Sequence, residues 1–231
     1  MSYLWQEFNI KTFPAETLVF RNGVFCEDLS DYKIAEFNKK ENIINILKTS
    51  KLPIHIIYIG EIAGNIDLNI NIKAENTKII FSGKITNKKP VFFNIFVKNT
   101  GKKSVFDGKI TALNYNSLEI NTKGEHLCKN TGIFIKTRVL ANKNTNTVLN
   151  GYAIINKNSE LCDSDVSFSV MADDSAKIIL KPTQFIQSVP KKAVHCASIY
   201  KPTMNQITYL QTSGLGKTEV KNVLKEAFLS E

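Results

Sequence analysis

The chain has 231 residues, of which 43% are hydrophobic and 22% charged, the composition of an ordinary folded protein with one large domain or two small ones. It lacks the roughly 20 consecutive apolar residues of a membrane helix and the apolar core of a secretion signal, so we expect a cytoplasmic protein without a membrane partner. The net charge is +9, but only Arg21 and Arg138 are arginines; because nucleic-acid readers depend on arginine, a solvated lysine-rich surface is favoured over a nucleic-acid site.

The first segment, residues 1–52, mixes aromatic and turn residues. Leu18–Phe20 and Val24-Phe25 flank Asn22-Gly23, a preferred two-residue turn, so a small hairpin is predicted. The lysine- and isoleucine-rich stretch 39–52 that follows is expected to form one short helix. Its apolar residues are Ile43, Ile44, Ile46 and Leu47.

From Pro53 to residue 200 the hydrophobic period changes to two. Ile66, Leu68, Ile70 and Ile72 alternate with polar residues, which predicts a half-buried strand. Further strands are expected at 78–85, 91–97, 109–113, 133–139, 152–155, 166–171 and 177–180. Turn residues separate these runs and no helical period interrupts them, which disfavours a βαβ sheet.

Two four-residue segments, 105–108 and 148–151, repeat weakly, and each is expected to close one strand before another begins. Regularly spaced short strands with Asn and Gly corners predict either a β-sandwich or a stacked β-solenoid. The asparagine-rich corners favour the solenoid, because stacked asparagines can satisfy backbone groups at the bends.

The final segment, residues 201–231, has a helical pattern. Thr203 and Gln206 form a capping box for a helix to about Thr212 that stops at Gly214. Thr218 is expected to cap a second helix with one apolar stripe. The stripe comprises Val220, Val223, Leu224, Ala227 and Phe228. It requires a surface to pack on, which is the last strands, the first helix or another protein.

The segment Gly214–Thr218 looks like the end of a phosphate-binding loop. The first glycine of that motif is replaced by Gln211, and the segment follows a helix where the motif needs a strand. A linker between two helices is therefore favoured. The three histidines are far apart in sequence and no G-x-S-x-G elbow is present, so no enzyme signature is found.

The four cysteines, Cys26, Cys128, Cys162 and Cys196, form no C-x-x-C pair, and free thiols are expected in a reducing cytosol. His126 and Cys128 would face the same side of a strand, but two ligands do not complete a metal site. His195 and Cys196 are neighbours on an expected strand, 192–200, so one faces the core and the other a surface.

Motifs at both ends resemble the SufB/SufD family, most closely a shortened SufD. The C-terminal motifs are Asp173-Asp174, Lys181-Pro182, His195–Ser198, Tyr209-Leu210, Ser213–Leu215 and Ala227-Phe228. The N-terminal ones are Leu18–Phe20, Asn22-Gly23 and Leu29–Asp31, and Val148–Gly151 is similar to a family corner. Residues 39–120 match only in β character.

The resemblance implies a right-handed parallel β-helix core, 53–200, after an entry segment, 1–52, and before a helical pair, 201–231. It implies a non-catalytic scaffold that pairs with a SufB-like subunit and docks a SufC-like ATPase. The docking residues would be Met204, Ile207, Leu210, Val220, Val223, Leu224 and Phe228.

A transient iron–sulfur cluster would form at the subunit interface, where the family motif makes His195 the metal ligand, with Cys196 beside it. Secondary candidates for this interface are Cys162, in a segment similar to a SufB motif, and the pair His126 and Cys128. Strand alternation with His195 toward the partner would turn Cys196 to the core.

The chain departs from the family in being shorter than a typical SufD and in having Cys196 where glycine or glutamate is usual. Two alternatives stay open. One is a β-solenoid interaction module without metal chemistry, and the other is a lysine-rich polyanion binder.

Overall fold

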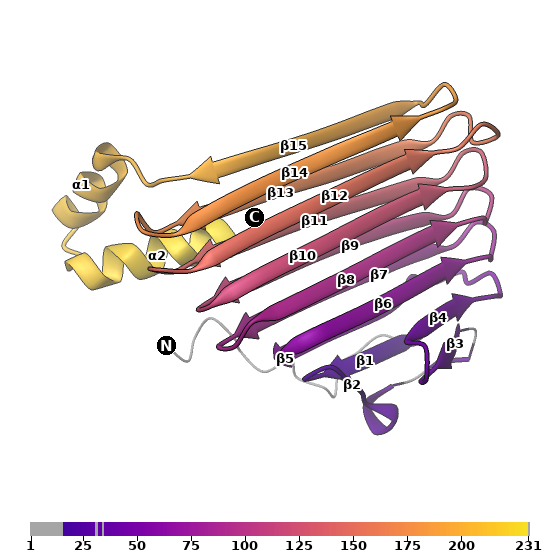
Figure 1. Cartoon of the computed structure of the whole chain (residues 1–231), viewed down its shortest axis with the longest axis horizontal. Coiled ribbons are helices and arrows are strands. Elements are labelled where there is room, and N and C mark those ends of the chain that lie inside the picture. The colour runs from indigo at the N-terminus through magenta and orange to yellow at the C-terminus, as the bar shows by residue number, and fades with distance from the viewer. Residues whose placement is uncertain (1–15, 31, 34, 231) are drawn as a thin grey trace.

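The computed structural model describes residues 16–30, 32, 33 and 35–230, and within them the chain is a β-solenoid of about six turns followed by two helices (Figure 1). Residues 1–15, on which the expectation of no secretion signal depends, lie outside the described part of the chain. So does Asp31, the last residue of the N-terminal family motif. Each turn of the solenoid contributes one strand to each of two facing, mainly parallel sheets, so the chain alternates between them.

Sheet A has eight strands, in the order β15-β13-β11-β9-β7-β5-β1-β2. Their bounds are β1 (Thr17–Arg21), β2 (Val24–Phe25), β5 (Ile54–Glu61), β7 (Lys78–Asn87), β9 (Val105–Asn114), β11 (Gly132–Ala141), β13 (Asp163–Ala172) and β15 (Lys192–Tyr200). Sheet B has seven strands, in the order β14-β12-β10-β8-β6-β4-β3. Their bounds are β3 (Ala35–Asn38), β4 (Ile43–Ile46), β6 (Gly64–Ile72), β8 (Val91–Asn99), β10 (Ser117–His126), β12 (Asn146–Ile155) and β14 (Lys177–Ile186).

The core lies between the two sheets. Every second side chain of a strand points inward, and residues at matching register positions of stacked strands point to the same side. Every second residue of each central strand is buried, as the period of two predicted. One inward row of sheet A runs along Ile56, Phe81, Gly108, Ile135 and Val166. Gly108 makes room for an aromatic ring, since a Cβ there would meet Phe106 at 2.6 Å.

Asparagines at the corners bind backbone groups of neighbouring coils, as the solenoid prediction required. Asn87 Nδ2 donates to Ser117 O at 3.1 Å, and Asn114 Nδ2 donates to Asn146 O at 2.8 Å. Both asparagines are buried, so these bonds satisfy polar groups that water does not reach.

An outward asparagine ladder also joins four strands of sheet B. Asn94 donates to Asp67, Asn121 to Asn94 and Asn150 to Asn121, at 2.6 to 2.7 Å.

Three expectations about the strands are corrected. The stretch 39–52 contains no helix: Ile43–Ile46 form β4, which pairs with β3 and β6. Residues 105–108 and 148–151 do not close strands but lie within the long strands β9 and β12. Strands β3, β5 and β10 were not among the predicted strands. The hairpin around Asn22-Gly23 is confirmed as β1 and β2, and both turn residues have positive φ.

The two helices are α1 (Met204–Thr212) and α2 (Lys217–Ser230). The capping box of Thr203 and Gln206 is confirmed. The second helix begins one residue before the expected cap Thr218, and the Gly216 amide donates to the Glu219 carboxylate at 2.7 Å. Neither helix, within the described part of the chain, is long and apolar enough to cross a membrane.

Candidate functional site

The two ends of the solenoid differ in how they are covered. At the N-terminal end, the hairpins β1–β2 and β3–β4 place a cluster of aromatic rings against the core. Phe25 packs between Phe20, Tyr32 and Phe37, with ring centroids 4.6 to 5.7 Å apart. Inward residues of this first coil, such as Leu18, are therefore buried.

At the C-terminal end, β14 and β15 are the last strands of their sheets and no described strand pairs with their outer edges. Figure 1 shows the two helices beside the stack and not across this end. Ile199, an inward residue of β15, is 52% exposed, and Ile186, an inward residue of β14, is 46% exposed. An unpaired strand edge is a template for pairing with another chain. We call this C-terminal end of the solenoid, with the unpaired edges of β14 and β15, the open end.

His195 and Cys196 both lie on β15 at the open end, and the register decides which one faces inward. His195 pairs with the buried Val166, whereas Cys196 pairs with Ser167 on the outer face. The expectation that Cys196 faces the core was wrong, because the thiol is exposed on the outer face. His195 continues an inward row, but it is exposed because no further coil covers it within the part of the chain that the structure describes.

The last coil carries further exposed apolar side chains. Phe185 and Val189 are 53% and 74% exposed, and Ile179 on the outer face of β14 is 48% exposed.

The secondary candidates His126 and Cys162 lie at a different place, a corner inside the solenoid. His126 Nδ1 is 2.7 Å from Thr131 Oγ1, which is 3.1 Å from Cys162 Sγ. Both the Thr131 hydroxyl and the Cys162 thiol are placed to donate to Cys128 O, at 3.0 and 3.3 Å. The structure therefore brings His126, Cys162 and the backbone of Cys128 together, with Thr131, which the sequence reading missed.

This corner fixes the state of the histidine. When Thr131 donates its one hydroxyl proton to Cys128 O, it accepts from His126 Nδ1, and in that arrangement the imidazole proton is on Nδ1. His126 Nε2 is buried without a hydrogen-bond partner, and burial lowers the pKa of His126 to about 4. His126 is therefore a neutral core side chain, whereas His195 is exposed.

Within the described ranges, no three His, Cys, Asp or Glu side chains form a group that could hold a metal ion. His195 and Cys196 point to opposite faces and do not converge on one atom.

Helix α2 packs on the outer face of sheet A, which is one of the surfaces expected for its apolar stripe. Val220 is buried, and Leu224 and Phe228 pack against Leu113, Leu140 and Met171. Phe228 stacks on Tyr200 at 5.9 Å, and Arg138 Nη1 donates to Phe228 O at 2.7 Å. A cation at the helix C-terminus is favourable for the helix dipole.

The seven expected docking residues thus fall into three groups. Val220, Leu224 and Phe228 anchor α2 to the solenoid, and Ile207 and Leu210 are half-buried. Met204 and Val223 are 73% and 40% exposed, and Tyr209, which was not among the seven, is 71% exposed.

The Gly214–Thr218 segment joins α1 to α2 and so has no strand before it, as the helix-linker interpretation predicted. Lys217 is the first residue of α2.

A comparison with protein families matches residues 50–228 to the family described as "SUF system FeS cluster assembly, SufBD core domain". The chain belongs to the SufBD core family. The match extends from the start of β5 almost to the end of α2, so it includes the open end and the helical pair. In a search of curated proteins, none matched the chain.

Membership connects this SufBD core protein with the SUF system of iron–sulfur cluster assembly. The family description covers both SufB and SufD. The match therefore supports the SufB/SufD resemblance but does not distinguish SufD from SufB.

Proposed function

We propose that this SufBD core protein is a non-catalytic SufD-like scaffold subunit for iron–sulfur cluster assembly. Its open end would pair with a SufB-like subunit, and its helical pair would dock a SufC-like ATPase. The observation that carries the proposal is the asymmetry of the solenoid: aromatic hairpins cover one end, whereas the other presents unpaired strand edges, apolar side chains and His195.

Backbone pairing supports the open end as the subunit interface. Lys192 N donates to Cys162 O, toward β13. Because amides alternate in direction along a strand, those of Ala193, His195 and Ala197 face the open edge, where a partner strand can accept from them. The exposed inward residues Ile186 and Ile199 add apolar area to this end.

The nascent cluster is the cargo of this interface in the proposal. His195 would supply one imidazole nitrogen from the inward row of β15, and the partner would supply the remaining ligands. A neutral imidazole coordinates iron through one nitrogen while a hydrogen bond orients the other. Because His195 and Cys196 point to opposite faces, the proposal assigns the ligand role to the histidine and not to the thiol.

The helical pair suits an ATPase because it holds exposed apolar residues on a fixed support. The contacts of Phe228 and Leu224 with the solenoid position α2, and the exposed Met204, Tyr209 and Val223 remain for a partner. Large apolar and aromatic side chains of this kind dominate binding energy at protein interfaces.

A charge substitution at the open end tests the pairing. Ala197→Asp puts a carboxylate on the exposed inward row of β15, and Val24→Asp puts one at an exposed position of the covered end. In coexpression with the host's SufB-like and SufC-like subunits, we expect Ala197→Asp to lose the SufB-like subunit and Val24→Asp to retain it. Equal recovery of that subunit with both variants would contradict the proposed interface.

A second candidate is an interaction module that pairs through the same end without metal chemistry. The exposed apolar side chains of the last coil favour it, because they could support pairing with no contribution from His195. Iron and acid-labile sulfide analysis of the complex separates the two functions. A stable complex with no iron or sulfide after anaerobic reconstitution would favour the module.

A further inference from the structure

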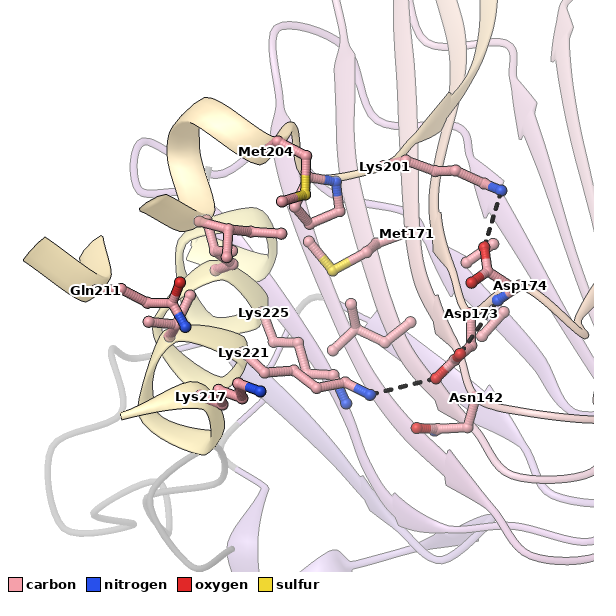
Figure 2. A pocket seen from close by; sticks show the side chains of 17 residues that line it. Asn142, Met171, Asp173, Asp174, Lys201, Met204, Gln211, Lys217, Lys221 and Lys225 are labelled. Carbon is pink, nitrogen blue, oxygen red and sulfur yellow. Dashed lines mark hydrogen bonds and ion pairs between the residues drawn. The ribbon is translucent and has the colours of Figure 1, made fainter. Parts of the chain in front are cut away.

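A cavity of about 510 Å³ lies where α1 and α2 meet the outer face of sheet A (Figure 2). It is separate from the open end and from the buried corner of His126. Its volume falls within the roughly 300–1,000 Å³ of small-molecule sites. Residues of β11, β13, α1 and α2 line it.

The floor of the cavity is apolar. Leu140 and Met171 rise from the outer face of sheet A, and Val220 and Leu224 face them from α2. Ile207 and Met204 contribute from α1. Figure 2 shows Met171 pointing into the space between the helices and the sheet. An apolar chain or ring placed here would be removed from water on several sides.

The rim carries more positive than negative charge. Lys201 pairs with Asp174 at 3.2 Å, and Lys221 pairs with Asp173 at 3.3 Å. Lys217 and Lys225 complete the cationic rim, and no anionic partner for either is found among the described side chains. With both aspartates paired, two ammonium groups remain uncompensated at the cavity.

The charge of Lys225 is unfavourable at its position. Burial lowers the pKa of Lys225, the neighbouring Lys221 lowers it further, and Asp173 partly opposes the change. Lys217, Lys221 and Lys225 also follow one another at four-residue spacing on α2, where like charges destabilise a helix. An anion beside them would relieve both effects.

We propose that this cavity binds a small amphiphile with a carboxylate or phosphate head group. The head lies beside Lys225 and Lys217 at the rim, and the apolar body lies over Met171 and Leu140. The inference does not depend on the proposed scaffold function, because it uses neither the open end nor a partner subunit.

Isothermal titration calorimetry of the full chain tests the site, with dodecanoate and dodecyl phosphate as probes below their micelle concentrations. We expect one saturable site for at least one anion, and at least tenfold weaker binding of dodecyltrimethylammonium. Lys217→Met/Lys225→Met should weaken anion binding at least tenfold, since both charges are removed while chain length is kept. Lys98→Met, which removes an exposed lysine on sheet B, is the matched control.

Thermal melting establishes that the double variant is folded, and Met171→Glu gives a second test by placing a carboxylate in the floor. Equal affinity for anionic and cationic amphiphiles, or unchanged affinity in both cavity variants, would overturn the proposal. So would absence of binding by either anion. If neither anion binds and added ATPase protects Ile207 and Val220 from hydrogen exchange, the cavity is a protein-docking groove and the proposal fails.

Discussion

His195 lies beside Val166 in the register of the last two strands of sheet A, so its side chain belongs to the inward row of the solenoid. Every earlier member of that row is covered by the next coil. At His195 the row reaches the open end, and an imidazole takes the place of an aliphatic core residue. A partner that stacks on this end would therefore meet His195 at the junction of the two cores, with Cys196 turned to the outer face.

The first prediction separates these two neighbours. His195→Ala should leave the purified SufB–SufC–SufD-type complex assembled but deplete its cluster, since the imidazole is the proposed ligand. Cys196→Ser should change neither iron content nor stability by much, within about 0.5 kcal/mol, because the exposed thiol has little core packing to lose. Iron and sulfide analysis, with denaturant unfolding of each variant, measures both effects.

The opposite pattern has a clear meaning. Normal cluster loading in His195→Ala together with loss in Cys196→Ser would identify the thiol as the ligand. The outer face of β15 would then be the assembly surface, in contradiction to the proposed role of the inward row.

The fold was largely predictable because most strands alternate apolar and polar residues. Strand β10 was missed because its inward positions include Thr122, Gly124 and His126. These residues are not strongly hydrophobic, so the alternation of apolar and polar residues is not visible in the sequence. The error at Ile43–Ile46 has another cause. Its cluster of isoleucines fits a helix or a strand by composition, and pairing with β6 decides in favour of the strand.

The second prediction concerns the attachment of α2. Phe228→Ala removes the stacking on Tyr200 and the contact of the ring with the Arg138 guanidinium, 5.7 Å from its centroid. We expect a loss of roughly 1–2 kcal/mol in the local stability of α2, because the side chain is only half-buried. Hydrogen exchange of α2 amides should accelerate about tenfold for each 1.4 kcal/mol lost.

Val223→Ala is the matched control, since Val223 is an exposed residue of the same helix. Exchange rates that change equally in both variants would show that Phe228 does not anchor the helix. Truncation before Thr203 is not a suitable alternative, because it would expose Leu113, Leu140 and Met171, which α2 covers.

The third prediction assigns ATPase docking to the exposed residues. Met204→Asp and Tyr209→Asp should each abolish or strongly weaken copurification of the ATPase, because a carboxylate is costly to bury in an apolar interface. The melting temperature of the isolated chain should stay unchanged, since both side chains are more than 70% exposed. Leu52→Asp, at an exposed apolar position of the solenoid, should retain the ATPase. If all three variants retain the ATPase, its docking surface does not include Met204 or Tyr209.

The sequence alone could suggest candidate site residues but could not show to which face of the sheet each side chain points. Alternation predicts that His195 and Cys196 face opposite sides, but the inward side depends on pairing with β13. The proximity of His126 and Cys162 could not be predicted from the sequence either. These residues are 36 positions apart and come together only through the stacking of coils. Thr131, which joins them, carries no sequence signal of its own.

The last prediction is a pH dependence of stability that arises from this corner. Burial lowers the pKa of His126 from 6.5 to about 4, so between these values the unfolded chain takes up a proton that the folded chain does not. Stability should therefore fall as the pH is lowered from about 6.5 to about 4, by at most roughly 3 kcal/mol from this residue. Above pH 6.5 both states are neutral and the contribution is constant.

His126→Gln removes the titrating group and keeps a polar side chain near Thr131. The variant should be less stable than the natural chain at neutral pH, because it loses the bond from Nδ1 to Thr131 and the packing of the ring. That difference should shrink as the pH falls, since only the natural chain carries the protonation penalty. Urea unfolding at a series of pH values from 7.5 to 4.5 gives the two curves. Parallel curves would mean that His126 is accessible to protons in the folded state, in contradiction to its burial.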